Sequence, residues 1–347
     1  MSGTACAARR ESAREMEQAG RWSAAAEAYA AAFRHGAAER SPEAMVEAAR
    51  GSARVRLAQG RLDEAEELAV LAGEMAALHG LERAGARALN VRGMIGFARH
   101  DLDGASGLYR HALERARAVH DDELVGHACQ NLGVVANIRG DLHEARTLYL
   151  ESIGASARTG DRTAALMAYH NLGVICTDMG EWLESELYFE RGLELAERLG
   201  HVPMLARLSV GVAEPLIHLG ELGQAGESLD RADRFARESD DREAAVAVLR
   251  FRGIVARLKG DTAAAGEYLE QALAESRAAG LELEQAQVLG GIAHLRYVEG
   301  RRAEACALLE AARDRFAALG ARREPARLDP ILAEWKASVL APGPDPA

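Results

Sequence analysis

The chain has 347 residues, of which 48% are apolar, only 5% are aromatic and 72 are alanine, so most of its apolar side chains are small. This composition favours closely packed helices and argues against an all-β or a parallel α/β fold, because few stretches show the β-branched and aromatic runs that strands prefer. The 53 acidic and 42 basic residues give a net charge of -11, which argues against direct binding of nucleic acid, since that requires a basic face.

Targeting signals and cysteine usage indicate where the chain works. No apolar run approaches the roughly 20 residues of a membrane span, and residues 1–18 carry charges where a signal peptide needs an apolar core. We therefore expect a cytoplasmic protein that does not contact membranes. Cys6, Cys129, Cys176 and Cys306 form no close pair, which predicts reduced thiols, buried and inert at Cys129 and Cys176, and no metal or other cofactor.

The strongest pattern is a glycine that recurs every forty residues and is interrupted only by His100. The members of this series are Gly20, Gly60, Gly140, Gly180, Gly220, Gly260 and Gly300. A second set lies halfway between them, at Gly80, Gly160, Gly200, Gly280 and Gly320. The left-handed conformation that ends a helix is cheap only without a Cβ, so each of these glycines is predicted to follow a helix. Each forty-residue unit is then a helical hairpin, with helices of about 14 to 17 residues.

Acidic residues next to these turns are predicted to start the following helix. Asp121-Asp122, Asp240-Asp241 and Gly140-Asp141 place side-chain acceptors where the first free backbone N–H groups of a helix lie.

Small and large side chains also keep the forty-residue register. Seven residues before each turn glycine stands a small residue, in the series Ala53, Gly93, Gly133, Gly173, Ala213, Gly253 and Ala293. Nine residues after it stands an apolar residue that is large in most units, in the series Tyr29, Ala69, Tyr109, Tyr149, Phe189, Leu229, Leu269 and Leu309. We expect the small residues to let helices approach closely and the large ones to fill the space between hairpins.

Together these positions resemble the tetratricopeptide repeat, a helix-turn-helix unit with small residues at the same relative places. The resemblance covers residues 7–320, with a repeat of 40 residues rather than 34, and is closest to the arrays of kinesin light chains, Pins-type adaptors and bacterial Rap-type peptide receptors. It implies an all-α, right-handed α-solenoid of about eight helical hairpins in one domain, 1–340. The predicted repeats are 3–40, 41–80, 81–120, 121–160, 161–200, 201–240, 241–280 and 281–320, followed by a capping helix at 324–340 and a disordered tail at 341–347.

In such arrays the first helix of each hairpin lines a concave groove. The stripe of each first helix that faces away from its second helix is predicted from the spacing of apolar residues. The candidate groove residues are Arg87, Asn90, Met94, His127, Gln130, Asn131, Val134, Asn137, Met167, His170, Asn171, Val174, Asp178, Arg207, Glu214, His218 and Arg250.

Several of these residues admit two interpretations. Asn131 and Asn171 occupy the same register in two Asn-Leu-Gly-Val sequences, and they either bind the backbone of an extended peptide or bond neighbouring helices. The groove arginines either dock a carboxylate or pair with the abundant acidic residues. Pro215 lies inside a predicted helix, where it opens the groove at the sixth hairpin, marks a hinge, or causes only a local bend.

The three tryptophans, Trp22, Trp182 and Trp335, are expected to belong to the core.

The sequence favours a non-catalytic scaffold that binds a protein partner or a peptide segment. The first alternative is a regulator whose superhelical pitch responds to a short signalling peptide. A less favoured one is an enzyme, or an accessory protein, that uses His127, His170 and Asp178 on a small molecule in the concave cavity. The chain lacks the common catalytic and nucleotide-binding motifs, and a homodimer remains open.

Overall fold

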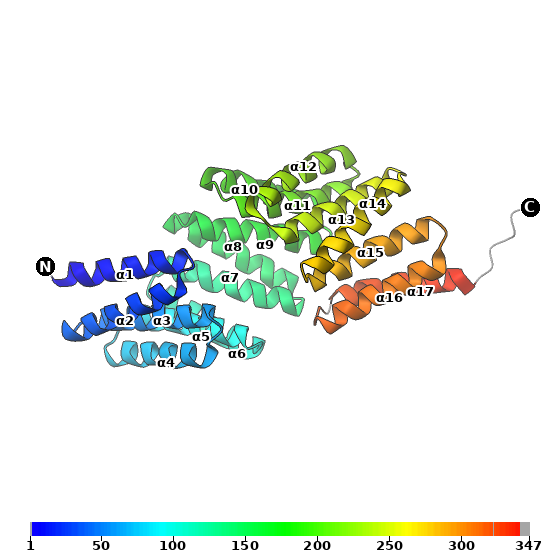
Figure 1. The fold of residues 1–347 in the computed structure, drawn as a ribbon. Helices are drawn as coiled ribbons and strands as arrows, with labels where there is room; N and C mark the ends of the chain where they lie inside the picture. The colour runs from blue at the N-terminus through cyan, green and yellow to red at the C-terminus, as the bar shows by residue number, and fades with distance from the viewer. Residues whose placement is uncertain (1, 322, 341–347) are drawn as a thin grey trace, which may run out of the picture. The chain divides into compact units, whose positions relative to one another are not determined.

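The computed structural model describes residues 2–321 and 323–340, and these residues form seventeen α-helices and no strand (Figure 1). The first helices of successive hairpins are α1 (Ser2–Gln18), α3 (Pro42–Ala58), α5 (Glu82–Ala98), α7 (Asp122–Arg139), α9 (Arg162–Met179), α11 (Val202–Leu219), α13 (Arg242–Leu258) and α15 (Glu282–Val298). The second helices are α2 (Trp22–Ala38), α4 (Leu62–Leu78), α6 (Leu102–Ala118), α8 (Leu142–Thr159), α10 (Trp182–Leu199), α12 (Leu222–Ser239), α14 (Thr262–Ala278) and α16 (Arg302–Ala318).

The predicted all-α solenoid of hairpins is therefore confirmed. A final helix, α17 (Arg323–Leu340), stands where the capping helix was expected. By their backbone contacts the helices form two compact units, Met1–Ala168 and Tyr169–Ala347, and the boundary falls inside α9. The single domain of residues 1–340 stays a prediction, and the predicted disordered tail at 341–347 lies outside the described residues.

Every turn between helices contains a residue in the left-handed conformation. All twelve glycines at multiples of twenty have a positive φ, between 62° and 92°. The remaining multiples of twenty also have a positive φ although none is glycine; they are Arg40, His100, His120 and Asp240. His100, which interrupts the glycine series, therefore has the same backbone conformation as the turn glycines.

The turn at residue 140 shows how the helix ends are satisfied. The Gly140 N–H donates to the Asn137 carbonyl at 3.0 Å, and the Asp141 N–H donates to the Ala136 carbonyl at 2.9 Å. These two bonds define the Schellman motif, which satisfies carbonyls at the helix end. Because the motif leaves only about three residues outside the helices, the helices are 17 or 18 residues long, at or just above the expected length.

The acidic helix starts are confirmed in part. The Asp121 carboxylate accepts from the Leu124 N–H at 3.3 Å, and that of Asp241 accepts from the Ala244 N–H at 3.0 Å. The expectation for Asp141 was wrong, because this side chain makes no capping hydrogen bond to α8.

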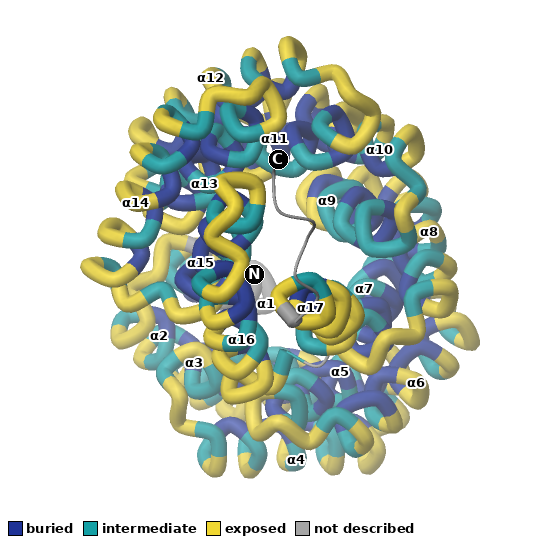
Figure 2. The backbone as a smooth tube through the Cα atoms, turned by 90° about the vertical axis from the view of Figure 1, so that its right-hand side faces the viewer, coloured by how far each residue is buried: buried dark blue, intermediate teal, exposed yellow. Residues whose placement is uncertain are grey.

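Close approach of helices at the small residues follows the predicted register. A Cβ on Gly133 would lie 2.6 Å from the ring of Tyr149, and one on Gly173 would lie 2.6 Å from the ring of Phe189. Both distances are shorter than real carbon contacts, so only glycine fits against these aromatic rings. Burial is concentrated where the helices pack against one another, whereas the turns are exposed (Figure 2).

Most expectations about single core residues are confirmed. Cys129 and Cys176 are fully buried, and burial raises the pKa of the Cys129 thiol to about 12, whereas the side chain of Cys6 lies outside the described residues. Trp335 is buried and its ring stacks on Tyr297 at 4.3 Å between centroids.

Trp22 is not a core residue, because 37% of it stays exposed at the start of α2.

Helix α11 runs through Pro215 from Val202 to Leu219 without a break. It is the one described helix that is long and apolar enough to cross a membrane, with a mean hydropathy of 1.2 over 18 residues. Half of this stretch is buried inside the structure, where α11 packs against α10, α12 and α13. This packing identifies α11 as a core helix of the solenoid.

We predict that His100→Gly stabilises the hairpin formed by α5 and α6. An exposed L-residue in the left-handed region costs about 1–2 kcal/mol, part of which is offset by the greater freedom of glycine in the unfolded chain. The expected gain is about 0.5–1 kcal/mol in the free energy of local opening, measured by native-state hydrogen exchange of the α5 and α6 amides. Gly80→Ala is the matched control and should reduce protection; unchanged exchange in both variants would contradict the strain.

Candidate functional site

A cavity of about 390 Å³ lies among α3, α5 and α7 within the first unit. Six predicted groove residues line it: Arg87, Asn90, Met94, His127, Gln130 and Asn131. Five further lining residues were missed: Arg50, Arg54, Val91, Glu123 and Leu124. The forty-residue register contained the signal for three of them, because Arg50 and Arg54 precede Asn90 and Met94 by one repeat, and Val91 precedes Asn131.

Three carboxamides, those of Asn90, Gln130 and Asn131, are among the polar groups that line this cavity. The Asn131 Nδ2 atom donates to the Asn90 Oδ1 atom at 3.2 Å, which joins α7 to α5. Asn131 thus makes the interhelical bond that was one of its two interpretations. Within the described chain, the Asn131 Oδ1 atom and the amide of Gln130 make no hydrogen bond, so donors and an acceptor remain free beside the apolar side chains of Met94 and Leu124.

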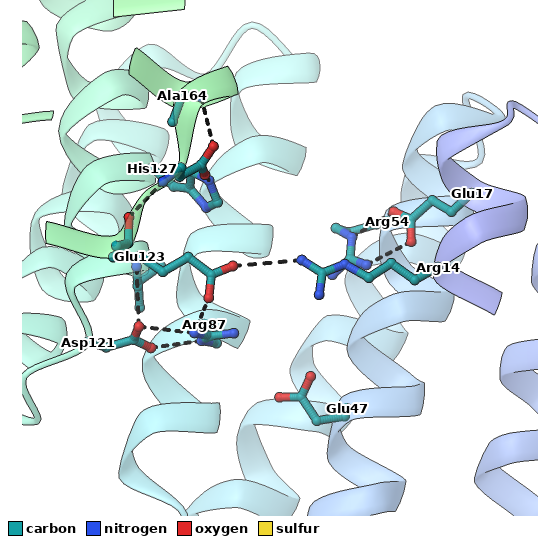
Figure 3. Close-up of polar contacts among 12 residues, drawn as sticks. Arg14, Glu17, Glu47, Arg54, Arg87, Asp121, Glu123, His127 and Ala164 are labelled. Atoms are coloured by element: carbon teal, nitrogen blue, oxygen red, sulfur yellow. Dashed lines mark hydrogen bonds and ion pairs between the residues drawn. The ribbon is translucent and has the colours of Figure 1, made fainter. Parts of the chain in front are cut away.

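The arginines that line the cavity are neutralised by carboxylates. Arg87 donates to both oxygens of Asp121, at 2.7 and 3.0 Å, and to Glu123 at 2.8 Å. Figure 3 shows the Glu123 carboxylate between Arg87 and Arg14, whose guanidinium lies 3.7 Å away. The ion-pair interpretation of Arg87 therefore holds.

The other two cavity arginines are paired as well. Arg54 donates to both carboxylate oxygens of Glu17 at 2.7 Å, and Glu17 also accepts from the Tyr29 hydroxyl. Arg50 pairs with Glu47 on its own helix. Burial alone would raise the pKa of Glu17, but the hydrogen bond and charge of Arg54 outweigh it and lower that pKa.

The ion pair of Arg87 and Asp121 shifts the pKa values of both residues. Burial acts to raise the pKa of Asp121, whose side chain is only 4% exposed, but the hydrogen bonds and charge of Arg87 lower it. The same hydrogen bond raises the pKa of Arg87 further above its ordinary value. Both groups therefore stay charged at neutral pH.

Contacts at the positions of Arg87 and Asp121 recur along the repeat. One repeat later, the His127 Nε2 atom lies 3.4 Å from the Asp161 carboxylate. In the second unit, Arg207 donates to Asp241 at 2.9 Å and to Glu243 at 3.3 Å. In each case a residue of one first helix binds the aspartate at the start of the next, so Arg207, like Arg87, is paired rather than free.

The remaining groove residues are distributed as follows. In α7, Val134 and Asn137 are half-buried but do not line the cavity, and at the end of the first unit Met167 is 38% exposed. In the second unit, the His170 Nδ1 atom lies 3.4 Å from the Asn171 Oδ1 atom, and burial lowers the pKa of His170. Val174 is half-buried, and the His218 ring stacks on Trp182 at 3.9 Å.

Asp178 is occupied by the last helix. Arg323 and Arg327 of α17 both bind its carboxylate, and Arg327 also donates to its backbone carbonyl at 2.9 Å. Two guanidinium groups thus hold the carboxylate that a catalytic role with His170 would require. Among the described residues no group of three His, Cys, Asp or Glu side chains can hold a metal ion.

Comparisons with known proteins agree with this architecture. The model of the tetratricopeptide-repeat family matches residues 127–198, from α7 to α10. This stretch of the chain is similar to the tetratricopeptide-repeat family. The matched stretch is about a fifth of the chain's length, and the shared forty-residue register continues on both sides of it. No curated protein sequence matches the chain.

Solved structures share the fold over most of the chain. The apo form of RapI has a TM-score of 0.69 at 13% identity, covering 96% of this chain and 98% of that one. A Rap protein complexed with Competence and Sporulation Factor has a TM-score of 0.57 at 15% identity, covering 98% and 99%. The apo quorum sensor NprR from B. thuringiensis has a TM-score of 0.63 at 17% identity, covering 89% and 86%. At these identities the similarity shows the fold.

We predict that Arg87→Met lowers the stability of the first unit by about 1.5–3 kcal/mol at pH 7, because it leaves the shielded Asp121 carboxylate without its main partner. The pKa of Asp121 is lowered in the folded state, so its contribution is present above the ordinary Asp pKa of about 4 and is lost as the pH falls through the folded value. Hydrogen exchange of α5 and α7 at pH 7 and urea unfolding from pH 7 to 3 measure this.

The difference between wild type and Arg87→Met should therefore shrink at acidic pH. Arg83→Met is the matched control, since Arg83 is 60% exposed and lies 3.8 Å from the same carboxylate. A difference that stays constant down to pH 3 would contradict the assigned role of this pair.

Proposed function

We propose that this protein is a non-catalytic, cytoplasmic scaffold that binds an extended peptide segment in the cavity formed by α3, α5 and α7. The observation that carries the proposal is the set of three carboxamides, Asn90, Gln130 and Asn131, beside apolar side chains in one cavity. A carboxamide offers both a donor and an acceptor, which is the pattern that a peptide backbone presents.

The energetics require several contacts at once. One hydrogen bond contributes about 0.5–1.5 kcal/mol, whereas a micromolar affinity corresponds to about -8 kcal/mol. Apolar contacts with Val91, Met94 and Leu124 would supply much of the remainder. The peptide is therefore expected to place a medium-sized apolar side chain next to the backbone that the amides bind.

The charges of the cavity disfavour peptides with a large net charge. Arg50, Arg54 and Arg87 already have carboxylate partners. A strongly acidic peptide would have to displace those partners, and a strongly basic one would have to displace the arginines. Backbone contacts and shape, rather than net charge, would then select the ligand of this cavity.

A peptide-responsive regulator is a second candidate, favoured by the similarity in fold over almost the whole chain to Rap and NprR structures. One of those proteins is a quorum sensor, and another is complexed with Competence and Sporulation Factor. In an array each hairpin touches mainly its neighbours, so a ligand that reorders one interface can influence the next.

Peptide capture tests the proposal. A pool of random decapeptides with blocked ends is enriched on the wild-type protein and on the variant Asn90→Ala, Gln130→Ala, Asn131→Ala, and the bound peptides are identified by mass spectrometry. Loss of three carboxamides should weaken the enriched peptides at least about tenfold, since tenfold equals about 1.4 kcal/mol.

The control is Gln224→Ala, which removes an exposed carboxamide of α12, and circular dichroism confirms that each variant is folded. Equal enrichment by the wild type and the triple variant would disprove the assignment of the cavity.

Hydrogen exchange with and without an enriched peptide distinguishes scaffold from regulator. A scaffold should gain protection only in α3, α5 and α7, which line the cavity. A regulator should also change in α2, α4 and α6, because binding alters the interfaces between hairpins. Protection confined to the lining helices would count against the regulator.

A further inference from the structure

Three charged side chains of the second unit lie on successive first helices and form no ion pair with one another. They are Glu214 on α11, Arg250 on α13 and Glu284 on α15, and all three are half-buried. Helix α13 packs against both α11 and α15. Within the described part of the chain, none of the three makes a hydrogen bond or an ion pair with another side chain.

Arg250 is the unusual member of this group. Its Nε atom is shielded from solvent and has no hydrogen-bond partner, and its guanidinium carbon lies 4.0 Å above the ring of Phe251. Both glutamates act on Arg250 electrostatically, but neither reaches it as an ion pair. A shielded N–H donor without a partner is costly, so the Nε atom of Arg250 can gain from an acceptor supplied by a ligand.

Two other arginines on α11 and α13 have carboxylate partners. Arg207 on α11 binds Asp241 and Glu243, and Arg252 on α13 binds Asp230 at 2.7 Å. Arg257, two turns along α13 from Arg250, also has no ion pair in the described chain, and burial lowers its pKa. Helix α13 therefore carries both paired and unpaired arginines.

Helix α15 has a glycine at the register that Arg250 holds on α13. A Cβ built on this residue, Gly290, would meet no atom within 4 Å. Glycine in a helix interior costs about 0.5–1 kcal/mol relative to alanine. Packing against the protein does not require this glycine, and its side of α15 faces open space.

We propose that Glu214, Arg250 and Glu284 form a mixed-charge subsite for a peptide segment that carries a carboxylate beside a basic side chain. The carboxylate binds the Arg250 guanidinium, and the basic group binds one of the two glutamates that flank it. One cation flanked by two anions disfavours a purely acidic ligand and a neutral one alike. This subsite rests on the proposed peptide-binding function and names the chemistry of part of the ligand.

Four peptide pools test the subsite, each with a random hexapeptide segment. The first ends in lysine with a free carboxylate, and the second carries an internal Lys-Glu pair with blocked ends. The third replaces lysine by norleucine and keeps the free carboxylate, and the fourth ends in amidated lysine. The first two distinguish a chain terminus from an acidic side chain as the source of the carboxylate.

Wild-type protein should enrich the first or the second pool about tenfold over the third and fourth, because charge-assisted hydrogen bonds to a shielded guanidinium are strong. Arg250→Gln should abolish the preference for a carboxylate, and Glu214→Gln with Glu284→Gln should abolish the preference for lysine. Arg252→Gln, which removes a paired arginine from the same helix, is the control and should keep both preferences.

The outcomes separate this inference from the proposed function. If the wild type captures all four pools equally, or if Arg250→Gln keeps the carboxylate preference, the subsite is disproved while peptide binding stands. If no pool is captured above a matrix without protein, both are overturned. Circular dichroism and the urea midpoint confirm folding, and Arg250→Lys, which keeps the charge, should retain part of the preference.

Discussion

The whole structure depends on one backbone constraint, the left-handed residue at every twentieth position. It closes a Schellman motif after most of the described helices and leaves about three residues for the turn. Equal helix lengths follow from it, and with them the equivalence of positions forty residues apart. Close approach of Gly133 to Tyr149 and of Gly173 to Phe189 is one consequence of this register. Even where glycine is replaced, as at His100, the conformation is kept despite its cost.

The same register organises the charged groups. The aspartates that start α7 and α13 also bind an arginine of the preceding first helix, so Asp121 and Asp241 each act as a cap and as an ionic link. Arg87 and Arg207 join hairpins in this way. Few polar side chains therefore remain free to bind a ligand. The most distinct of them are the carboxamides of the first unit and the unpaired Arg250 of the second.

Much of the fold could be predicted from the sequence because a structural repeat appears in the sequence as a fixed spacing of similar residues. Glycine spacing gave the helix ends, and the small and large residues gave the packing. The register also indicated six residues that line the cavity, and Arg50 and Arg54 could have been added by moving one repeat back. Capping was predicted less well: Asp141 has the expected residue type but a side chain that does not bond the backbone.

Contacts between distant parts of the sequence were beyond such reasoning. Arg323 and Arg327 reach Asp178 across about 145 residues, and this depends on how the hairpins of the second unit curve rather than on any local pattern. Whether an arginine finds a carboxylate, as Arg207 does, or stays unpaired, as Arg250 does, depends likewise on distances that composition does not contain. The exposure of Trp22 could not be predicted for the same reason.

The central claim is that the carboxamides of α5 and α7 hold a peptide backbone. Isotope-edited NMR on the protein bound to a captured peptide tests it most directly, through contacts between the side-chain amide protons of Asn90, Gln130 and Asn131 and the backbone protons of the peptide. The account predicts such contacts, together with shifts of these three amide signals on titration. Peptide contacts that arise only elsewhere in the protein, with these signals unmoved, would contradict it.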